Sequence, residues 1–319
     1  MSQTKTIVKE AGIANRKRMK NILIHSFFIL VSVFYVLPFL YVISISLSNE
    51  KDVADFGYKL VPMNFDLTAY TYVFANAKVL INGYLVTAFQ TLAGTVLSIL
   101  LMAMAAYPLS RTIFKLRSAV ILFILLAMFF GPGPGTSFGS VPTVPSYILV
   151  SRYLHLSDSI WAYIIPGLAV PLYIIMFVTF FKSISEAMIE SAKIDGAGEL
   201  NVFFRIIIPL SKPILATLSF MVLLARWNDF MTSLIYISNP NLVTLQFLLQ
   251  KILWESEFLK SLAENSFHGI GIDVVSGSTA PLETMTFAMC IIAAGPMLVI
   301  FPFFQKYFSK GMMIGSVKG

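Results

Sequence analysis

Charged residues are rare in the apolar stretches of this chain, and the two found well inside one lie close together. Arg226 and Asp229 fall in a hydrophobic stretch that runs from about residue 214 to 237. Their i, i+3 spacing places them on adjacent turns of one helical face, where they can pair. Together with Trp227 and Asn228 they offer hydrogen-bond donors, acceptors and an aromatic face, which sugar hydroxyls and sugar rings require. We expect these four residues either to line a path for a polar solute or to form an ion pair that fixes one helix against its neighbours.

Groups for covalent or metal chemistry show no recognisable arrangement in the sequence. The three histidines have no metal-ligand spacing, and the single cysteine, Cys290, excludes an internal disulfide and is expected to pack as a small apolar residue. The Gly- and Pro-rich run 131–135 has no lysine, and its prolines remove backbone donors, so it is no phosphate-binding loop. We therefore expect no catalytic residue, no metal and no cofactor in this chain.

The composition indicates an integral membrane protein. Of 319 residues, 57% are hydrophobic and only 12% are charged, and the mean hydropathy is +0.80. Soluble domains carry about 25% charged residues, so a soluble globular enzyme is excluded. The net charge of +7 would suit a nucleic-acid partner, but the positions of the charges argue against one.

Six stretches are long and apolar enough to cross the roughly 30 Å hydrocarbon core of a bilayer. They lie near 22–48, 84–109, 118–136, 160–181, 214–237 and 284–305. The third is the shortest and runs into a Gly- and Pro-rich segment at 131–145, which is either an extended external loop or a broken helix end. The first follows a basic tail, but it is about twice as long as the apolar region of a cleaved signal peptide, so we expect it to remain as a span.

Basic residues lie mostly on one side of these six stretches. Sixteen of the 23 Lys and Arg residues fall in the N-terminal tail, in the turn after the second stretch, in the interval after the fourth and near the C-terminus. The three opposite intervals hold six, and Arg226 is the remaining one. Because cytoplasmic segments carry the excess of Lys and Arg, both termini are predicted to be cytoplasmic, which requires an even number of spans.

The cytoplasmic interval 183–213 carries the most informative pattern. Ser183 with Glu186 fits a capping-box start, and apolar residues recur at helical spacing as far as Ile194. The pair Asp195-Gly196 then predicts a sharp turn, because glycine adopts the positive φ that such turns need. A second helix is expected to start near Ala197, with prolines interrupting it before the fifth span. Two short helices at an angle suit a projection that docks in a groove of another protein.

The same interval resembles a known signature. Glu190, Ser191 and Ala192, followed by Gly196 and then by the run 206–209 (IIIP), resemble the EAA motif of bacterial ABC-importer permeases. The departures are Ser191 and Ile208, where that motif has Ala and Leu, and Asp195-Gly196-Ala197 is the form typical of sugar importers. Three further stretches agree with it: 106–111 (AYPLSR), 227–230 (WNDF) and 311–319 (GMMIGSVKG). The chain therefore resembles the maltose-type permease family, nearest the branch that handles aldouronate and other complex oligosaccharides.

This resemblance implies an all-α polytopic membrane protein with six transmembrane helices and the ABC type I importer permease fold. It divides the chain into a cytoplasmic tail at 1–21, a permease domain at 22–308 and a cytoplasmic tail at 309–319. It also implies a coupling helix at 184–200 that contacts an ATPase subunit. The coupling residues implied in this way are Glu190, Ser191, Ala192, Asp195, Gly196, Ala197 and Pro209.

The implied protein is a transport subunit and not an enzyme. With a second permease it would form the path for a sugar or oligosaccharide that an external solute-binding protein delivers. Two partner ATPase subunits would bind ATP and Mg, and the assembly would lie in the lipid of the bacterial cytoplasmic membrane.

The sequence leaves alternatives open for the solute, for the class of transporter and for the external intervals. The alternative solute is a peptide or another polar molecule. The alternative protein class is a secondary transporter, which would need ion-coupling groups at membrane depth. The external intervals 49–80 and 238–281 suit either a docking surface or a solvated linker. Tyr41, Trp161 and Tyr163 are expected to anchor helices at the membrane interface.

Overall fold

The structure, a computed structural model, describes residues 2–75, 77–130, 144–266 and 281–314. These residues form helices and no strand, with one isolated β-bridge between Ser48 and Phe65. The helices before the gap at 131–143 are α1 (Ser2–Ser46), α2 (Glu50–Phe56), α3 (Thr68–Ala75), α4 (Ala77–Ser110) and α5 (Arg117–Phe130). After it come α6 (Val144–Ile148), the π-helix η1 (Leu149–Tyr153), α7 (Trp161–Ile164), α8 (Pro171–Lys182), α9 (Glu186–Ile194), α10 (Glu199–Val202), the π-helix η2 (Phe203–Ile207), α11 (Ile208–Leu210), α12 (Lys212–Trp227), α13 (Met231–Tyr236), α14 (Leu245–Ser266) and α15 (Leu282–Ile314).

The chain divides into two compact units, one of residues 1–73 with 277–291 and one of residues 74–276 with 292–319. In the first unit the apolar part of α1, Met19–Ser46, has a mean hydropathy of 2.5 and is mostly exposed. Phe34 and Tyr35, for example, each expose 71% of their surface. A long helix that shows aromatic and aliphatic side chains to its surroundings is typical of a span in contact with lipid or another membrane protein.

In the same unit, a residue far away in the sequence caps the start of α15. Glu50 accepts hydrogen bonds from the backbone N–H groups of Glu283 and Thr284, each at 2.9 Å, and from the Thr284 hydroxyl at 2.7 Å. The first N–H groups of a helix lack partners within it, and a negative charge there also complements the helix dipole. The interval 49–80 is therefore held, at Glu50, to the start of α15.

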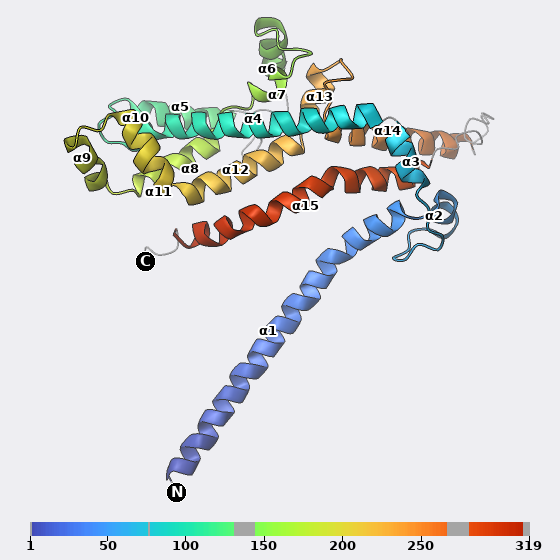
Figure 1. The fold of residues 1–319 in the computed structure, drawn as a ribbon, viewed down its shortest axis with the longest axis horizontal. Helices are drawn as coiled ribbons and strands as arrows, with labels where there is room; N and C mark the ends of the chain where they lie inside the picture. Colours follow the sequence, from blue (N-terminus) through green and yellow to red (C-terminus); the bar gives the residue numbers. More distant parts are fainter. Residues whose placement is uncertain (1, 76, 131–143, 267–280, 315–319) are drawn as a thin grey trace. The chain divides into compact units, whose positions relative to one another are not determined.

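In the second unit α4 is the central helix, and Figure 1 shows α8 and α12 running beside it. Ala103 and Ala106 on the buried face of α4 have no exposed surface. Small side chains of this kind let neighbouring helices approach closely in membrane proteins. Phe177 and Phe181 of α8 and Leu218 of α12 complete an apolar cluster against this face.

The predicted spans correspond to helices of two kinds. Three helical stretches are each long and apolar enough to cross a membrane: Met19–Ser46, Ala77–Ser110 and Leu282–Gln305. Two bent helix pairs, α8 with α9 and Glu199–Leu210 with α12, raise this number to five if each is counted as one span. The third predicted span is represented by the 14 residues of α5, and its expected end and the run 131–135 lie outside the described residues. The described residues thus support a multi-pass helical protein, with the exact count left as a prediction.

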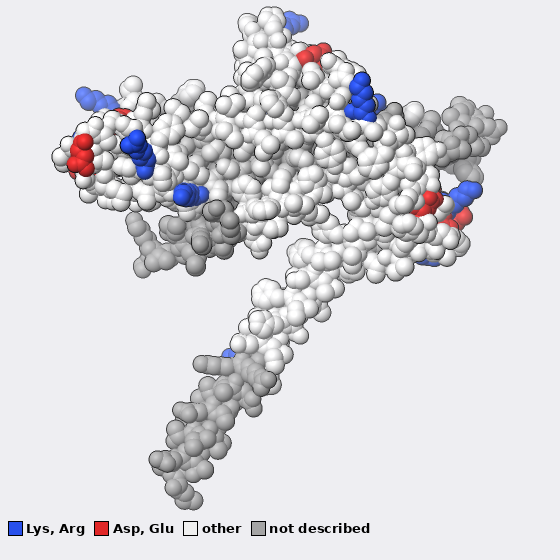
Figure 2. Space-filling view, in the orientation of Figure 1, with Lys and Arg blue, Asp and Glu red and all other residues white. Residues whose placement is uncertain are grey.

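Two of the predicted spans are interrupted by irregular backbone. The stretch 160–181 contains the short α7, a non-helical segment at 165–170 and then α8. The stretch 214–237 contains α12, a break at 228–230 and then α13. Peptide groups exposed by such breaks need internal hydrogen-bond partners at membrane depth. On the face of the second unit that Figure 2 shows, charged side chains gather at the α9–α10 end and around α6 and α13, and the surface between these two groups is uncharged.

Candidate functional site

The segment Glu186–Val202, here called the helix pair, has the turn that the sequence predicts. After α9, Gly196 has a φ of +84°. The Gly196 N–H donates to the Lys193 carbonyl at 3.0 Å, and the Ala197 N–H donates to the Ala192 carbonyl at 2.9 Å. These two bonds form a Schellman motif, whose left-handed position favours glycine. The turn and the end of α9 at Ile194 are confirmed.

Two details of the predicted helix pair are wrong. The residue before α9 is Ser185, which makes no capping hydrogen bond through its side chain, whereas Ser183 donates its hydroxyl to the Phe180 carbonyl at 2.6 Å. The expected capping box is therefore not formed, because the chain is still leaving α8 at Ser183. The second helix begins at Glu199 rather than near Ala197, because Ala197 belongs to the hydrogen-bonded turn.

The helix pair buries one side and exposes the other. Ile189 and Val202 are buried, and Ala192 and Ala197 pack against the apolar cluster of the second unit. Among the predicted coupling residues, Glu190, Ser191 and Asp195 are exposed. Large apolar side chains are exposed as well, with Ile194 at 86% and Leu200 at 66%. Large apolar side chains exposed together on one edge are typical of a surface that a partner covers.

The path from the helix pair to α12 contains a sharp bend at the predicted prolines. Pro209 lies exposed in α11, and Pro213 lies in the first turn of α12. The segment Glu199–Leu210 meets α12 at 81°. Because proline lacks an N–H and cannot continue a helical ladder, the interruption there has a local cause, as the sequence predicts.

At the other end of α12, the Arg226 side chain is buried, with 7% of its surface exposed. Its guanidinium donates to the carbonyl of Tyr163 at 2.8 Å, to the carbonyl of Gly167 at 2.9 Å and to the Ser98 hydroxyl at 2.9 Å. A longer bond of 3.4 Å reaches the Ile164 carbonyl. Arg226 therefore supplies the donors that the interrupted stretch between α7 and α8 needs.

A glycine on α4 makes room for this arginine. A Cβ atom added at Gly94 would lie 2.5 Å from Nη1 and 2.6 Å from Cζ of Arg226. A Cβ added at Gly167 would lie 3.2 Å from Nη2. We call these residues the Arg226 cluster: Arg226, Gly94, Ser98, Tyr163 and Gly167. It joins α4, α12, α7 and the segment between α7 and α8.

The ion pair between Arg226 and Asp229 that the spacing allows is not formed, because each side chain has other partners in the described part of the chain. Asp229 accepts from the backbone N–H of Thr232 at 3.0 Å and from its hydroxyl at 2.6 Å, at the start of α13. Trp227 is buried and donates its indole N–H to the Ala293 carbonyl at 3.0 Å. The helix ends at Trp227, so Asp229 is no longer one helical turn beyond Arg226.

Asn228 is the member of the predicted set that lies on the surface. Its side-chain amide donates to the Leu224 carbonyl at 2.9 Å and accepts from Gln246 of α14 at 3.3 Å. Asn228 is exposed, while Arg226 and Trp227 are buried. The structure thus separates the four residues into one surface amide and three side chains that hold the protein together.

The sequence missed most of the Arg226 cluster, and it gave Tyr163 a different role. Tyr163 is buried and its hydroxyl bonds to Ser233 at 2.7 Å and to the Leu242 carbonyl at 2.8 Å, so its expected place at the membrane interface is wrong. Gly94 and Ser98 are ordinary small residues in an apolar stretch. Their four-residue spacing indicates that they share one face of α4, but it does not indicate which side chain packs against that face.

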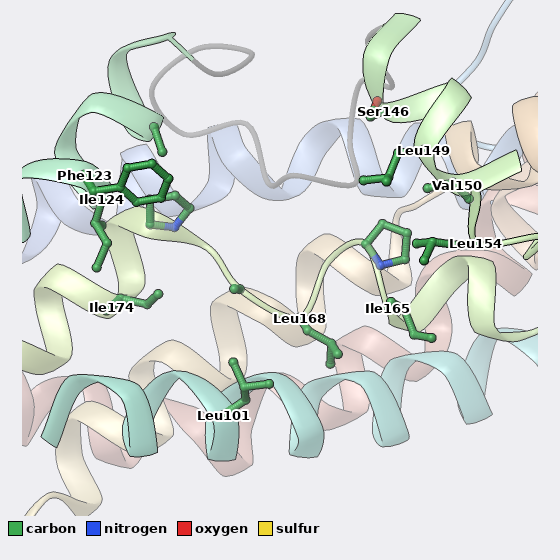
Figure 3. Close-up of a pocket in the computed structure, with 14 residues that line it drawn as sticks. Leu101, Phe123, Ile124, Ser146, Leu149, Val150, Leu154, Ile165, Leu168 and Ile174 are labelled. Carbon is green, nitrogen blue, oxygen red and sulfur yellow. The ribbon is translucent and has the colours of Figure 1, made fainter. Parts of the chain in front are cut away.

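A cavity of about 460 Å³ lies between α4, α5, η1 and the segment between α7 and α8. Figure 3 shows Leu101, Phe123, Ile124 and Leu168 pointing toward it. Apart from Ser146 its lining residues are apolar. A hydroxyl-rich solute requires several polar partners, so this cavity does not suit one.

Three comparisons with known proteins bear on this arrangement. A family model described as "Binding-protein-dependent transport system inner membrane component" matches residues 11–314. The "Polygalacturonan/rhamnogalacturonan transport system permease protein YtcP" of Bacillus subtilis (strain 168) is 34% identical over 304 residues, which cover 95% of this chain and 100% of that protein. "Protein LplC" of the same organism is 35% identical, covering 89% of this chain and 90% of LplC.

Among solved structures, a chain of a bacterial ABC transporter involved in the import of the acidic polysaccharide alginate has a similar fold. The TM-score is 0.73 at 26% sequence identity, over 91% of this chain and 97% of that one. The similarity in sequence and in fold therefore extends over nearly the whole length of both.

Proposed function

Because the chain belongs to the family of binding-protein-dependent transport system inner membrane components, we propose that it is the permease subunit of an ATP-driven importer for an oligosaccharide. The observation that carries the proposal is the family match over residues 11–314. YtcP and the alginate importer chain, both named for the transport of polysaccharides, support the choice of solute. The chain is a transport component and not an enzyme.

The helix pair is proposed as the contact with an ATPase subunit. Its turn has a fixed shape, because Gly196 and the Schellman hydrogen bonds determine it, and it exposes Glu190, Ser191 and Asp195. Ala192 and Ala197 are half-buried and set the helix pair against the rest of the second unit. Pro209 marks the bend that turns the chain into α12. ATP and Mg would be bound by the ATPase subunits.

The proposed assembly has a second permease, two ATPase subunits and an external solute-binding protein. The excess of Lys and Arg in these segments supports a cytoplasmic position for both termini and for the helix pair, in a protein of the bacterial cytoplasmic membrane. Six spans follow if the interrupted stretches at 160–181 and 214–237 and the stretch that contains α5 each cross once. The permease domain is then 22–308, with tails at 1–21 and 309–319.

For the solute path we retain Asn228 from the four residues predicted. It is exposed, and with Gln246 it presents amide groups that can bond to hydroxyls. The polar atoms of Arg226, Trp227 and Asp229 are directed at protein groups instead.

The test is to purify the tagged chain after expressing its gene with the neighbouring genes. We expect an ATPase and a second permease to copurify, and the ATPase activity to rise with a binding protein loaded with oligosaccharide. The solutes to compare are neutral and uronic-acid-containing oligosaccharides, with a peptide of similar size. If the chain purifies alone, or if only the peptide stimulates ATPase activity, the proposal is wrong.

A pair of glycines tests the helix pair specifically. A Cβ at Gly196 or at Gly198 would meet nothing within 4 Å, but only Gly196 has a positive φ. Gly196→Asp is therefore expected to distort the turn at a cost of about 1 to 2 kcal/mol and to reduce ATPase binding, while Gly198→Asp keeps it. If both variants bind the ATPase equally well, the shape of this turn does not determine ATPase binding.

A further inference from the structure

Glu199 lies where three elements of the second unit meet. It is the first residue of α10, and its two carboxylate oxygens have different partners. The Lys193 ammonium in the last turn of α9 bonds to Oε1, and the Tyr107 hydroxyl of α4 donates to Oε2 at 2.9 Å. One carboxylate thus joins both helices of the pair to the central helix of the unit.

The Tyr107 end of this contact is fixed. Tyr107 is buried at 8% exposure, and its ring centre lies 5.6 Å from that of Phe203. On another side the Arg111 guanidinium lies 5.4 Å from the ring centre and also donates to the Phe181 carbonyl at 3.3 Å. The tyrosine hydroxyl therefore moves with α4, whereas the carboxylate moves with the helix pair.

The Lys193 side keeps the carboxylate charged. The hydrogen bond from Lys193, and to a smaller degree the one from Tyr107, lower the pKa of Glu199 from its ordinary value. A group with a lowered pKa is ionised throughout the neutral range, so both oxygens remain acceptors there. The arrangement of two donors on one carboxylate is therefore present at working pH.

Space for movement lies beside the contact. A cavity of about 400 Å³ is lined by Tyr107, Arg111, Phe114, Lys193 and Glu199, among others. The cavity opens to the surface, since Ile113 and Glu199 in its lining are exposed, so side chains here can rearrange without displacing a core residue. The helix pair can therefore shift while Glu199 remains bonded to Tyr107.

The central helix leads from this contact to the Arg226 cluster. Ser98 lies nine residues before Tyr107 on α4, which is about 14 Å along a helix. A helix of this kind moves as one body between these two points. A shift at Tyr107 is thus transmitted to the interrupted stretches that Arg226 holds.

We propose that Glu199 is a positioning residue that links the helix pair to α4, so that movement imposed by an ATPase subunit is passed to the membrane part of the permease. This inference rests on the proposed function. Glu199 does not touch the solute or the ATP; it acts through Tyr107.

The test uses the complete importer in liposomes with its loaded binding protein. Wild type is compared with Glu199→Gln, Tyr107→Phe and the double variant, and the readout is solute imported per ATP hydrolysed. Because the lost bond is charge-assisted but the Glu199 side chain is partly exposed, we expect this ratio to fall about three- to tenfold in each single variant. The double variant is expected to be no worse than Glu199→Gln, because Tyr107→Phe removes one of the two contacts that the Glu199 carboxylate makes.

The control is Glu255→Gln, which removes an exposed Lys–Glu pair on α14 (Lys251 Nζ to Glu255 Oε1, 3.8 Å) and is expected to leave the ratio unchanged. Assembly and thermal stability of each variant complex are measured in parallel, because a purely structural role would lower these and not the ratio. If Tyr107→Phe reduces the yield of complex, Glu199→Gln alone decides.

Two outcomes overturn the inference: an unchanged ratio in Glu199→Gln, or a double variant whose loss is the product of the two single losses. Failure of the proposed function is distinguishable from these, since then no ATPase associates with the wild-type chain.

Discussion

The helix pair and the Arg226 cluster use charged residues in opposite ways. In the Arg226 cluster a buried guanidinium bonds to carbonyls and a hydroxyl of its own chain, and a glycine leaves room for it. In the helix pair, Glu190 and Asp195 are exposed beside Ile194, and only Glu199 is tied inward. The difference teaches that charge inside the membrane part serves the fold, whereas charge on the helix pair remains available to a partner.

The strongest challenge to this contrast is Arg226→Met. The variant would remove the guanidinium donors to the carbonyls of Tyr163 and Gly167 and to the Ser98 hydroxyl, and only the Gly167 carbonyl would keep another side-chain donor, the Ser98 hydroxyl at 3.2 Å. Each group left unsatisfied costs about 1 to 3 kcal/mol. We expect the thermal midpoint of the purified complex to fall by many degrees, or the chain to fail to assemble. Arg152→Met on the exposed side of η1 is the control and should change little. A stable Arg226→Met complex that fails only in transport would show that Arg226 belongs to the solute path instead.

Gly94→Ala tests the same cluster from α4. The added methyl would be 2.5 Å from Nη1, so the arginine or the helix must shift, and overpacking of this kind costs about 1 to 3 kcal/mol. The matched control is Gly295→Ala on α15, where an added Cβ meets nothing within 4 Å. Thermal unfolding of the two variants side by side measures the difference. Equal midpoints would mean that Arg226 has room to move.

Asn228→Ala probes the surface member of the predicted set. It removes the amide bonds to Leu224 and Gln246, and we expect a loss of about 1 kcal/mol or less in stability. The larger effect should be on import, as a raised solute concentration for half-maximal rate with ATPase coupling intact. Unchanged import kinetics would remove Asn228 from the path.

Ile194→Ser should have the smallest effect on the chain itself. The side chain is 86% exposed, so the free energy of unfolding should change by no more than about 0.5 kcal/mol. If the ATPase covers this edge, its affinity for the permease should fall measurably in a titration. A stability loss comparable to that of Gly94→Ala would contradict the contrast between the two regions.

What the sequence predicts well is local. Asp195-Gly196 predicts the turn because the chemistry of a glycine after a short helix decides the backbone there. Pro209 predicts the bend for the same kind of reason. Continuous apolar stretches long enough to cross a bilayer predict the apolar parts of α1, α4 and α15, although each helix extends beyond its predicted stretch.

The remainder depends on contacts between distant parts of the chain. Arg226 has its partners 59 to 63 positions earlier, in α7 and the segment after it, and 128 positions earlier on α4. Periodicity cannot indicate which carbonyls become free, because that depends on where the stretch 160–181 breaks. The pairing with Asp229 was predicted on an unbroken helix, and the helix ends between the two residues. The Glu199 contact also joins residues 92 positions apart.

The cap that Glu50 provides for α15 has a consequence for how the protein is made. The hydrogen bonds span 233 and 234 positions of sequence. At a synthesis rate of about 5 to 20 residues per second, the acceptor leaves the ribosome roughly 10 to 50 s before its donors exist. The first unit is therefore completed only when the last described helix, α15, has been synthesised. A nascent chain halted before Glu283 contains α1 and Glu50, but it lacks the backbone N–H groups to which Glu50 bonds.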